Sequence, residues 1–405
     1  MRTLTSLRGA LLGAVAVLGV GTGAMAPASA AEQGVTDTEI LIGLFAPMSG
    51  QLAAFGFDPL QAAKMWYEEI NKKGGIHGRK IKVIVEDDKC TPTEAVAVVK
   101  KLATVDKVFI VNGGSCTAAA VAAQEFVTRE KMPFVMLNAA GDGAVIPPTR
   151  YVFGAFGGTQ RAVGATIMEF AIKELKAKKV AFIAHDDDFG NSNWATAKAV
   201  AAKMNVEIVA VERIPPRITD VTAPMLKVRA ANPDVIISTA YPAPAVLIAQ
   251  KYAEYALTKT PLVQAVQGVP IPAVFAKNVG NDAALVNFYY GSPLNDLTDG
   301  PKQQKWIALY KQYYPDRTPG AFMTYGLPSA MAITRALEKV GKDVTREKFV
   351  DAMETLEFDS EVLAGQSAFG KDRRDGYRSS IFIRFDGKKH TLMPGVYSWN
   401  GKDGM

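Results

Sequence analysis

The chain has 405 residues, of which 48% are hydrophobic and 21% are charged. Its formal net charge is +6, and the basic residues are spread along the chain. This does not favour nucleic-acid binding, which usually shows a concentrated basic patch, and we expect no nucleic-acid partner. A mature chain of roughly 375 residues is too long for one core and indicates two domains of ordinary size.

Residues 1–30 predict a cleaved secretory signal peptide. Arg2 and Arg8 precede an apolar stretch that ends at Val20, and Ala28-Ser29-Ala30 forms a small-residue cleavage site. The apolar stretch is shorter than the ~20 residues of a membrane-spanning helix, and no cysteine follows it to carry a lipid. We therefore expect an exported mature chain that starts near Ala31.

Strand-length apolar runs then alternate with helix-length amphipathic runs. The first four strands are predicted at 39–45, 80–87, 108–111 and 134–137. The helices between them begin at Asp58-Pro59, at Pro92 and after Cys116. This alternation predicts a parallel sheet with helices on both faces.

A second βα series follows the stretch "YVFGAFGGTQ" (151–160) and predicts another α/β lobe. Its helices are expected at 160–176, 192–203, 220–231 and 244–256. Its strands are expected at 179–185, 206–214, 234–240 and 261–266. The tail contains three predicted helices, at 301–313, 320–341 and 345–355, and then strand-rich segments, at 379–387 and 390–400. We expect this tail to complete both lobes, so that the chain crosses between them several times.

The two cysteines, Cys90 and Cys116, predict one disulfide, because an even pair in an exported protein is usually oxidised. The alternative is a reactive thiol at Cys116, which the helix that follows would activate. That function would need a base, and no histidine lies nearby in the sequence.

Motifs of catalysis and nucleotide binding are missing, including the phosphate loop, the dinucleotide glycine pattern and the nucleophile elbow. His77, His185 and His390 follow no metal spacing and are expected at the surface or in loops. The acidic run 186–188 lacks the alternate spacing of a calcium loop, so a solvated loop is expected there. We predict no cofactor and no metal.

The informative positions all follow predicted strands. In doubly wound sheets, ligands bind beyond the carboxyl ends of strands, where loops and helix N-termini meet. Those ends carry hydroxyls, glycine amides and the single aromatics Phe55, Phe189 and Tyr241. This combination suits a small organic ligand with one polar end and an apolar body.

The stretches "EILIGLFAPMSGQLAAFG", "INKKGGIHGRKIKVIVEDDKCTPTEAVAVVKKL", "HDDDFG" and "AYPAP" resemble the branched-chain amino-acid binding proteins of ABC transporters. The resemblance runs from about Thr38 to Trp399. It implies the type I periplasmic binding protein fold, in which two α/β lobes joined by a three-strand hinge close over a ligand. The lobes implied for this chain are 31–157 plus 292–370 and 158–291 plus 371–401. Some members also have a disulfide that Cys90 and Cys116 resemble.

The resemblance also implies the ligand-binding residues. Phe55 resembles the aromatic that packs on the ligand side chain, and Thr117, beside Ser115, resembles the hydroxyl that binds the ligand carboxylate at a helix N-terminus. Ala139, Ala140 and Gly141 resemble the loop that holds carboxylate and ammonium. Phe189 and Tyr241 resemble the second-lobe aromatics that cap the ligand.

Two positions depart from the family pattern. The acid that binds the ammonium group is replaced by Gln267, and the loop threonine is replaced by Gly141, which Asp142 follows. A buried ammonium needs an anionic or multiply accepting partner, so losing a carboxylate weakens the amino-acid interpretation. An aromatic carboxylate, a fatty or keto acid, or an amide fits as well. Asp142 would restore the charge if its side chain turned inward.

We therefore expect a monomeric periplasmic solute-binding protein that performs no covalent chemistry and delivers a small amphipathic solute to an ABC permease in the inner membrane. One alternative is an extracellular sensing module of the same fold for a separate membrane receptor. Another is an amide or ester hydrolase, which would need a base beside Ser115 or Thr117.

Overall fold

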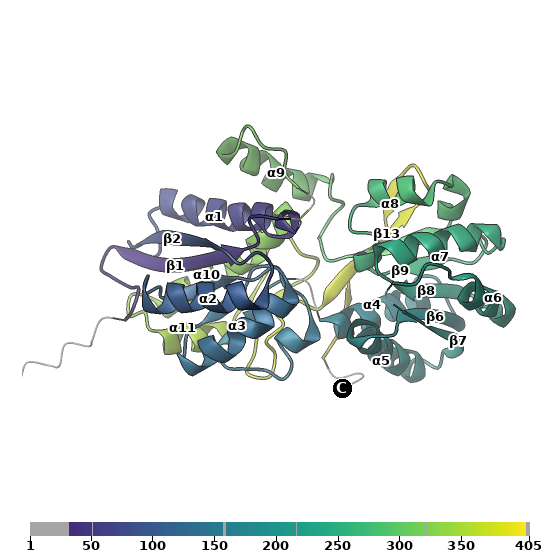
Figure 1. Ribbon diagram of the computed structural model, residues 1–405, viewed down its shortest axis with the longest axis horizontal. Coiled ribbons are helices and arrows are strands. Elements are labelled where there is room, and N and C mark those ends of the chain that lie inside the picture. Colours follow the sequence, from purple (N-terminus) through teal and green to yellow (C-terminus); the bar gives the residue numbers. More distant parts are fainter. Residues whose placement is uncertain (1–31, 51, 157–158, 216, 321, 402–405) are drawn as a thin grey trace, which may run out of the picture. The chain divides into compact units, whose positions relative to one another are not determined.

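The computed structural model describes residues 32–401 apart from 51, 157–158, 216 and 321. The described residues belong to one compact unit with two large sheets, each covered by helices (Figure 1). The predicted signal peptide, residues 1–30, lies outside the described residues and stays a prediction. Among those described, no helix combines the length and the apolar character needed to cross a bilayer.

The first sheet has five parallel strands. In spatial order they are β2 (Lys80–Asp87), β1 (Glu39–Ala46), β3 (Ile110–Gly113), β4 (Phe134–Met136) and β5 (Val152–Gly154). Because successive side chains of a strand point to opposite faces of the sheet, β1 contributes to two hydrophobic cores. Ile42 packs into one core and Phe45 into the other. Both faces of the sheet are therefore buried, as expected of parallel strands.

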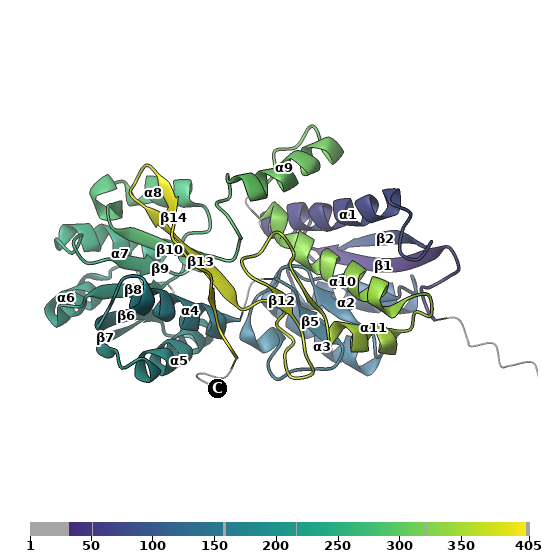
Figure 2. The same cartoon turned by 180° about the vertical axis from the view of Figure 1, so that it is seen from behind.

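Helices from distant parts of the chain cover this sheet. Those on the Phe45 side are α2 (Pro92–Thr104) and α3 (Thr117–Arg129). Those that pack into the Ile42 core are α1 (Phe57–Lys72), α9 (Pro301–Tyr313), α10 (Leu327–Val340) and α11 (Arg346–Met353). Of these, α9 and α10 contact α1, and α11 packs against α10, an arrangement that Figure 2 shows from behind.

The second sheet is mixed. Its strands in spatial order are β14 (His390–Leu392), β13 (Ser379–Phe385), β10 (Phe288–Ser292), β9 (Leu262–Gln264), β8 (Val235–Thr239), β6 (Lys179–His185) and β7 (Glu207–Ile214). β13 runs antiparallel to β10 and also pairs with β15 (Tyr397–Ser398), while the pairs from β10 to β7 are parallel. The C-terminal strands therefore extend this sheet.

The second sheet is also buried on both faces. Phe182 of β6 packs into the core that includes α4 (Gln160–Lys173) and α5 (Asp188–Lys203). Ile183, its neighbour, packs on the opposite side. The helices on that side are α6 (Thr222–Ala231), α7 (Pro242–Glu254) and α8 (Pro272–Val279).

The chain passes between the sheets three times: after β5, after β10 and before β13. Hydrogen bonds join these segments, since Gly154 N donates to Arg374 O at 2.8 Å and the Tyr377 hydroxyl donates to Pro293 O at 2.7 Å. A small ladder of β11 (Glu357–Phe358) and β12 (Ser367–Ala368) precedes the third segment. The prediction that the tail completes both lobes is confirmed, whereas the exact lobe boundaries stay a prediction.

The described part of the chain contains five short 3₁₀ helices between the longer elements. They are η1 (Ala53–Phe55), η2 (Asp142–Ala144), η3 (Val266–Gly268), η4 (Asp282–Leu285) and η5 (Met323–Gly326). Tight turns of this kind are common as connectors next to longer elements. Four of them, η1, η2, η3 and η5, carry residues that are important for the site described next.

Candidate functional site

One cavity brings together six of the ten predicted ligand-binding residues. It has a volume of about 350 Å³, and Phe55, Ser115, Thr117, Ala140, Tyr241 and Gln267 all line it. A larger hollow of about 500 Å³ beside α1 and β2 is lined by charged side chains such as Lys64 and Glu68 and contains none of the predicted residues. The first cavity is therefore the candidate site.

The turn between β3 and α3 forms one end of the cavity. Gly114 has a φ of +78°, a conformation that glycine adopts without strain and that sends the chain directly into α3. The first intrahelical bond runs from Ala120 N to Cys116 O, so the N–H groups before Ala120 have no acceptor within the helix. Such groups favour an anion.

The two hydroxyls at this turn differ in their partners. The Thr117 hydroxyl donates to Ala140 O at 3.0 Å and so holds the loop after β4 against α3. The Ser115 Oγ is buried and has no hydrogen-bond partner in the described part of the chain. Ser115 is thus the hydroxyl that remains free for a ligand.

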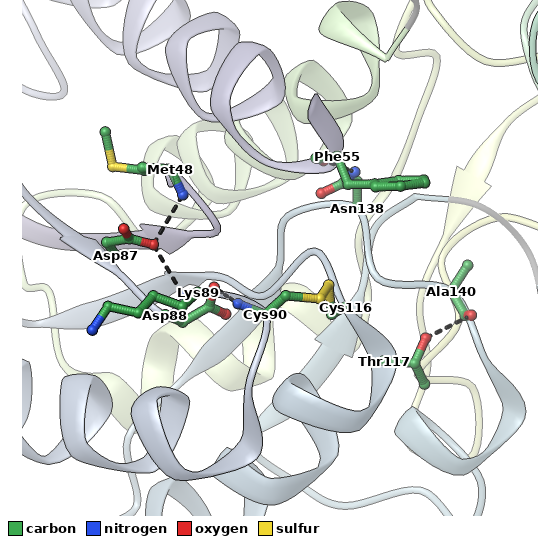
Figure 3. The surroundings of a disulfide bond; sticks show 10 residues. All are labelled: Met48, Phe55, Asp87, Asp88, Lys89, Cys90, Cys116, Thr117, Asn138 and Ala140. Atoms are coloured by element: carbon green, nitrogen blue, oxygen red, sulfur yellow. Dashed lines mark hydrogen bonds between the residues drawn. A yellow bond between two sulfur atoms is a disulfide. The ribbon is translucent and has the colours of Figure 1, made fainter. Parts of the chain in front are cut away.

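The predicted disulfide is present and lies beside this turn (Figure 3). Cys90 precedes α2, Cys116 is the N-cap residue of α3, and their Cα atoms are 5.5 Å apart. The bond therefore ties the starts of two neighbouring helices together. The alternative of a reactive thiol at Cys116 is excluded in this oxidised state.

Asn138 is a cavity residue that the sequence did not single out. It follows β4 and is only 8% exposed, and its Nδ2 donates to Phe55 O at 2.9 Å, which fixes the backbone of η1. Its Oδ1 is buried and has no partner among the described residues. A buried acceptor without a partner is costly, so a ligand donor would be favoured there.

Four aromatic side chains form a continuous wall of the cavity. The ring of Phe55 stacks on Phe322 with centroids 5.0 Å apart, and Phe322 meets Tyr325 at 5.4 Å. Tyr325 in turn stacks on Phe156 at 4.0 Å. Burial raises the pKa of Tyr325 to about 12, so it is neutral at physiological pH. We call these four residues the aromatic wall.

Tyr241 contributes an aromatic ring from the second sheet. It precedes α7, and its ring packs against His185 at 4.2 Å and Phe189 at 4.8 Å. Its hydroxyl donates to the Asp187 carboxylate at 3.1 Å. Phe189 lies against Tyr241 and is not among the residues that line the cavity, so the structure brings only one of these two predicted aromatics to it.

His185 corrects a sequence prediction. It was expected at the surface or in a loop, but it is fully buried at the end of β6, where its Nε2 accepts a hydrogen bond from Tyr241 N at 2.7 Å. Burial lowers the pKa of His185, which keeps it neutral. The expected solvated loop at 186–188 is also wrong in part, because Asp187 caps α5 and Asp188 begins it.

Asp142 does not supply a free negative charge. Its Oδ1 accepts from Gln160 N at 2.8 Å, at the start of α4, and its Oδ2 forms an ion pair with Arg161 Nε at 3.4 Å. The neighbouring Ala139 and Gly141 line a water-sized space of about 10 Å³ that Ala140 and Phe156 also line. The charge of Asp142 is therefore compensated within the protein.

Gln267 lines the cavity from η3. Its Nε2 donates weakly to Gln160 Oε1 at 3.4 Å, and its Oε1 is buried without a partner among the described residues. No Asp, Glu, Lys, Arg or His lines this cavity in the described part of the chain. The same residues contain no cluster of three His, Cys, Asp or Glu side chains that could hold a metal ion.

Residues 39–389 match the profile of a family described as periplasmic binding protein. A relative from Brucella abortus (strain 2308), called Leu/Ile/Val-binding protein homolog 7, is 26% identical over 383 residues, which cover 91% of this chain and 93% of the relative. The resemblance noted in the sequence is thereby confirmed.

Two solved structures are similar in fold. An ABC transporter substrate-binding protein from Sphaerobacter thermophilus has a TM-score of 0.75 at 19% identity and covers 91% of this chain and 100% of its own. A solute-binding protein of an ABC transporter from Rhodopseudomonas palustris, solved with 4-hydroxybenzoate, has a TM-score of 0.69 at 20% identity and covers 89% and 97%. The predicted fold class is therefore confirmed.

Proposed function

Because the chain belongs to the periplasmic binding protein family, whose profile matches residues 39–389, we propose that it is the substrate-binding protein of an ABC importer. The observation that carries this proposal is the cavity of about 350 Å³, where buried polar atoms of Ser115, Asn138 and Gln267 have no protein partner among the described residues. One small organic solute with a polar end and an apolar body satisfies these atoms. The chain acts in the periplasm as a monomer, exported by residues 1–30.

In this proposal, no covalent bond of the solute is made or broken during transport. The lobes, 31–157 plus 292–370 and 158–291 plus 371–401, each contribute to the cavity, so a solute that contacts both stabilises the closed arrangement. A permease in the inner membrane then accepts the solute from the closed form.

A binding role fits the hydroxyls better than hydrolysis does. Thr117 uses its hydrogen on Ala140 O, and Ser115 Oγ has no base within hydrogen-bonding distance among the described residues. An activated serine nucleophile needs such a base. The ligand-binding role proposed for Phe55, Ser115, Thr117, Ala140, Tyr241 and Gln267 rests on their position around one cavity. Ala139, Gly141, Asp142 and Phe189 do not line this cavity, and we propose that they act through neighbours that do, as Phe189 does by packing on Tyr241.

A ligand screen tests the proposed function. We expect at least one organic acid, amino acid or amide to raise the unfolding temperature of the mature protein and to bind with a stoichiometry of one in calorimetry. At a ligand concentration of 100 times Kd, the stabilisation should be about 2.7 kcal/mol. Saturable turnover of a bound amide or ester would contradict the proposal, as would a complete absence of binders across these three classes.

Replacing Asn138 with alanine should weaken binding of the solute found in that screen by about tenfold, since one ligand hydrogen bond and the support of Phe55 are lost together. Calorimetric titration measures the change in Kd. Asn278→Ala, on α8 and away from the cavity lining, is the control and should bind as the wild type does. Equal affinities of wild type and Asn138→Ala would show that Asn138 contributes nothing to binding.

A further inference from the structure

The aromatic wall gives the cavity a continuous apolar surface. Phe55, Phe322, Tyr325 and Phe156 follow one another with centroid separations between 4.0 and 5.4 Å. Phe55, at the start of the series, is 44% exposed despite being a large apolar side chain. Offset stacking and edge contacts stabilise ring pairs beyond the burial of area alone, so this wall favours a ligand that itself contains a ring.

None of the described residues that line the cavity offers an anion to a ligand ammonium group. Asp142 is paired with Arg161 and with the start of α4, and Asp187 accepts hydrogen bonds from Gly190 N and the Tyr241 hydroxyl. Among the described residues, an ammonium would meet only neutral oxygens. Burying a charge without an opposite charge costs several kcal/mol, which disfavours an α-amino acid.

The same cavity does offer a place for an anion. The N–H groups before Ala120 have no acceptor within α3, a helix of 13 residues, and the unpartnered Ser115 hydroxyl lies beside them. Asn138, which is 8% exposed, lines the same cavity, and its buried Oδ1 has no partner among the described residues and requires a donor. A carboxylate at α3 and a neutral donor elsewhere on the ligand would satisfy both groups.

We propose that the solute is an aryl carboxylic acid that carries a neutral hydrogen-bond donor, such as a ring hydroxyl, and has no ammonium group. This inference rests on the proposed function and makes it more specific. The aromatic wall packs on the ring, the N-terminus of α3 and Ser115 hold the carboxylate, and Asn138 and Gln267 accept from the neutral donor.

Calorimetry on the mature protein with four probes tests the inference. Each probe is a propanoate that carries a six-membered ring on its third carbon: phenylpropanoate, its para-hydroxy derivative phloretate, cyclohexylpropanoate and L-phenylalanine. Phenylpropanoate should bind about 100-fold more tightly than L-phenylalanine, which adds only the ammonium. It should bind about five- to tenfold more tightly than the saturated ring. Phloretate should bind most tightly of the four.

The outcomes separate the inference from the proposed function. If L-phenylalanine or L-leucine binds with a stoichiometry of one and as tightly as the acids or more so, the inferred class is wrong and the binding function stands. If cyclohexylpropanoate equals phenylpropanoate, the role of the aromatic wall is wrong. If neither the acids nor the amino acids and amides of the screen bind, the proposed function itself fails.

A charge added at Gln267 gives an independent test. Gln267→Glu should weaken phloretate binding by about tenfold and strengthen L-phenylalanine binding by at least about tenfold, because it restores an anion for the ammonium. Gln304→Glu, the same change at an exposed position of α9, is the matched control and should leave both affinities unchanged. Unchanged ligand preference in Gln267→Glu would overturn the inference.

Discussion

Replacing both Cys90 and Cys116 with alanine is expected to lower the free energy of unfolding by about 3 to 4 kcal/mol. The disulfide joins residues that are 26 apart in the sequence, and opening that loop increases the conformational freedom of the unfolded chain. In the folded state the bond joins the starts of α2 and α3, so its loss also loosens the turn that carries Ser115. The destabilisation should therefore be accompanied by weaker ligand binding.

Urea denaturation of the double variant and the wild type measures this effect. The control is the wild type in a reducing agent, which should unfold at the same urea concentration as the variant. Two reactive thiols in unfolded, unreduced wild-type protein would disprove the disulfide. Coincident unfolding curves for variant and oxidised wild type would show that the bond adds no stability.

The regular part of the fold could be predicted from hydrophobic periodicity and helix caps. The prediction of α2 from Pro92 is confirmed because Thr91 and Pro92 form a capped start that depends only on local sequence. The prediction that α5 begins at 192 is wrong, since Asp187 caps it and the helix begins at Asp188. The start of α5 was missed because the acidic run 186–188 is equally typical of a solvated loop.

The elements that were missed depend on distant partners. β10 (Phe288–Ser292) is held between β9 and β13, and β13 lies almost a hundred residues later in the chain. α8 has only eight residues and follows the short turn η3. Segments this short carry little periodic signal, and tertiary pairing decides their conformation.

The candidate site could be predicted only in part, for the same reason. The residues after strands, such as Ser115 and Tyr241, were found because parallel strands bring their carboxyl ends to one edge. Phe156, Phe322 and Tyr325 were missed, since they lie on a connecting segment and in or beside η5, where no local pattern points to a ligand. Whether the Asp142 carboxylate is free for a ligand could not be predicted, because its partners Arg161 and Gln160 come close to it only in the folded chain.

Asp88→Asn is expected to stabilise the protein by about 2 kcal/mol at pH 8. Asp88 is fully buried next to the disulfide, where its Oδ1 accepts from Cys90 N at 3.0 Å and its Oδ2 has no partner among the described residues. Burial raises its pKa from the usual 3.8 to about 6. At pH 8 the wild type must bury a charged carboxylate, whereas asparagine keeps the acceptor for Cys90 N without the charge.

The neighbouring Asp87 provides the matched control. Burial alone would raise its pKa, but hydrogen bonds from Met48 N and Lys89 N, which Figure 3 shows, and from the Ser49 hydroxyl outweigh burial. They hold the pKa below the usual value. Its charged form is thus stabilised by folding. Asp87→Asn should destabilise the protein by about 1 kcal/mol at pH 8, opposite in sign to the change one residue later.

The pH dependence of the unfolding free energy shows whether the buried charge of Asp88 causes the stabilisation expected for Asp88→Asn. Because the pKa of Asp88 is raised in the folded state, that state binds the proton more readily, and the wild type loses stability as the pH rises from about 4 to 6. Urea denaturation should therefore show no advantage of Asp88→Asn below pH 4 and the full advantage above pH 6. A constant difference across this range would mean that packing, and not the buried charge, distinguishes the two proteins.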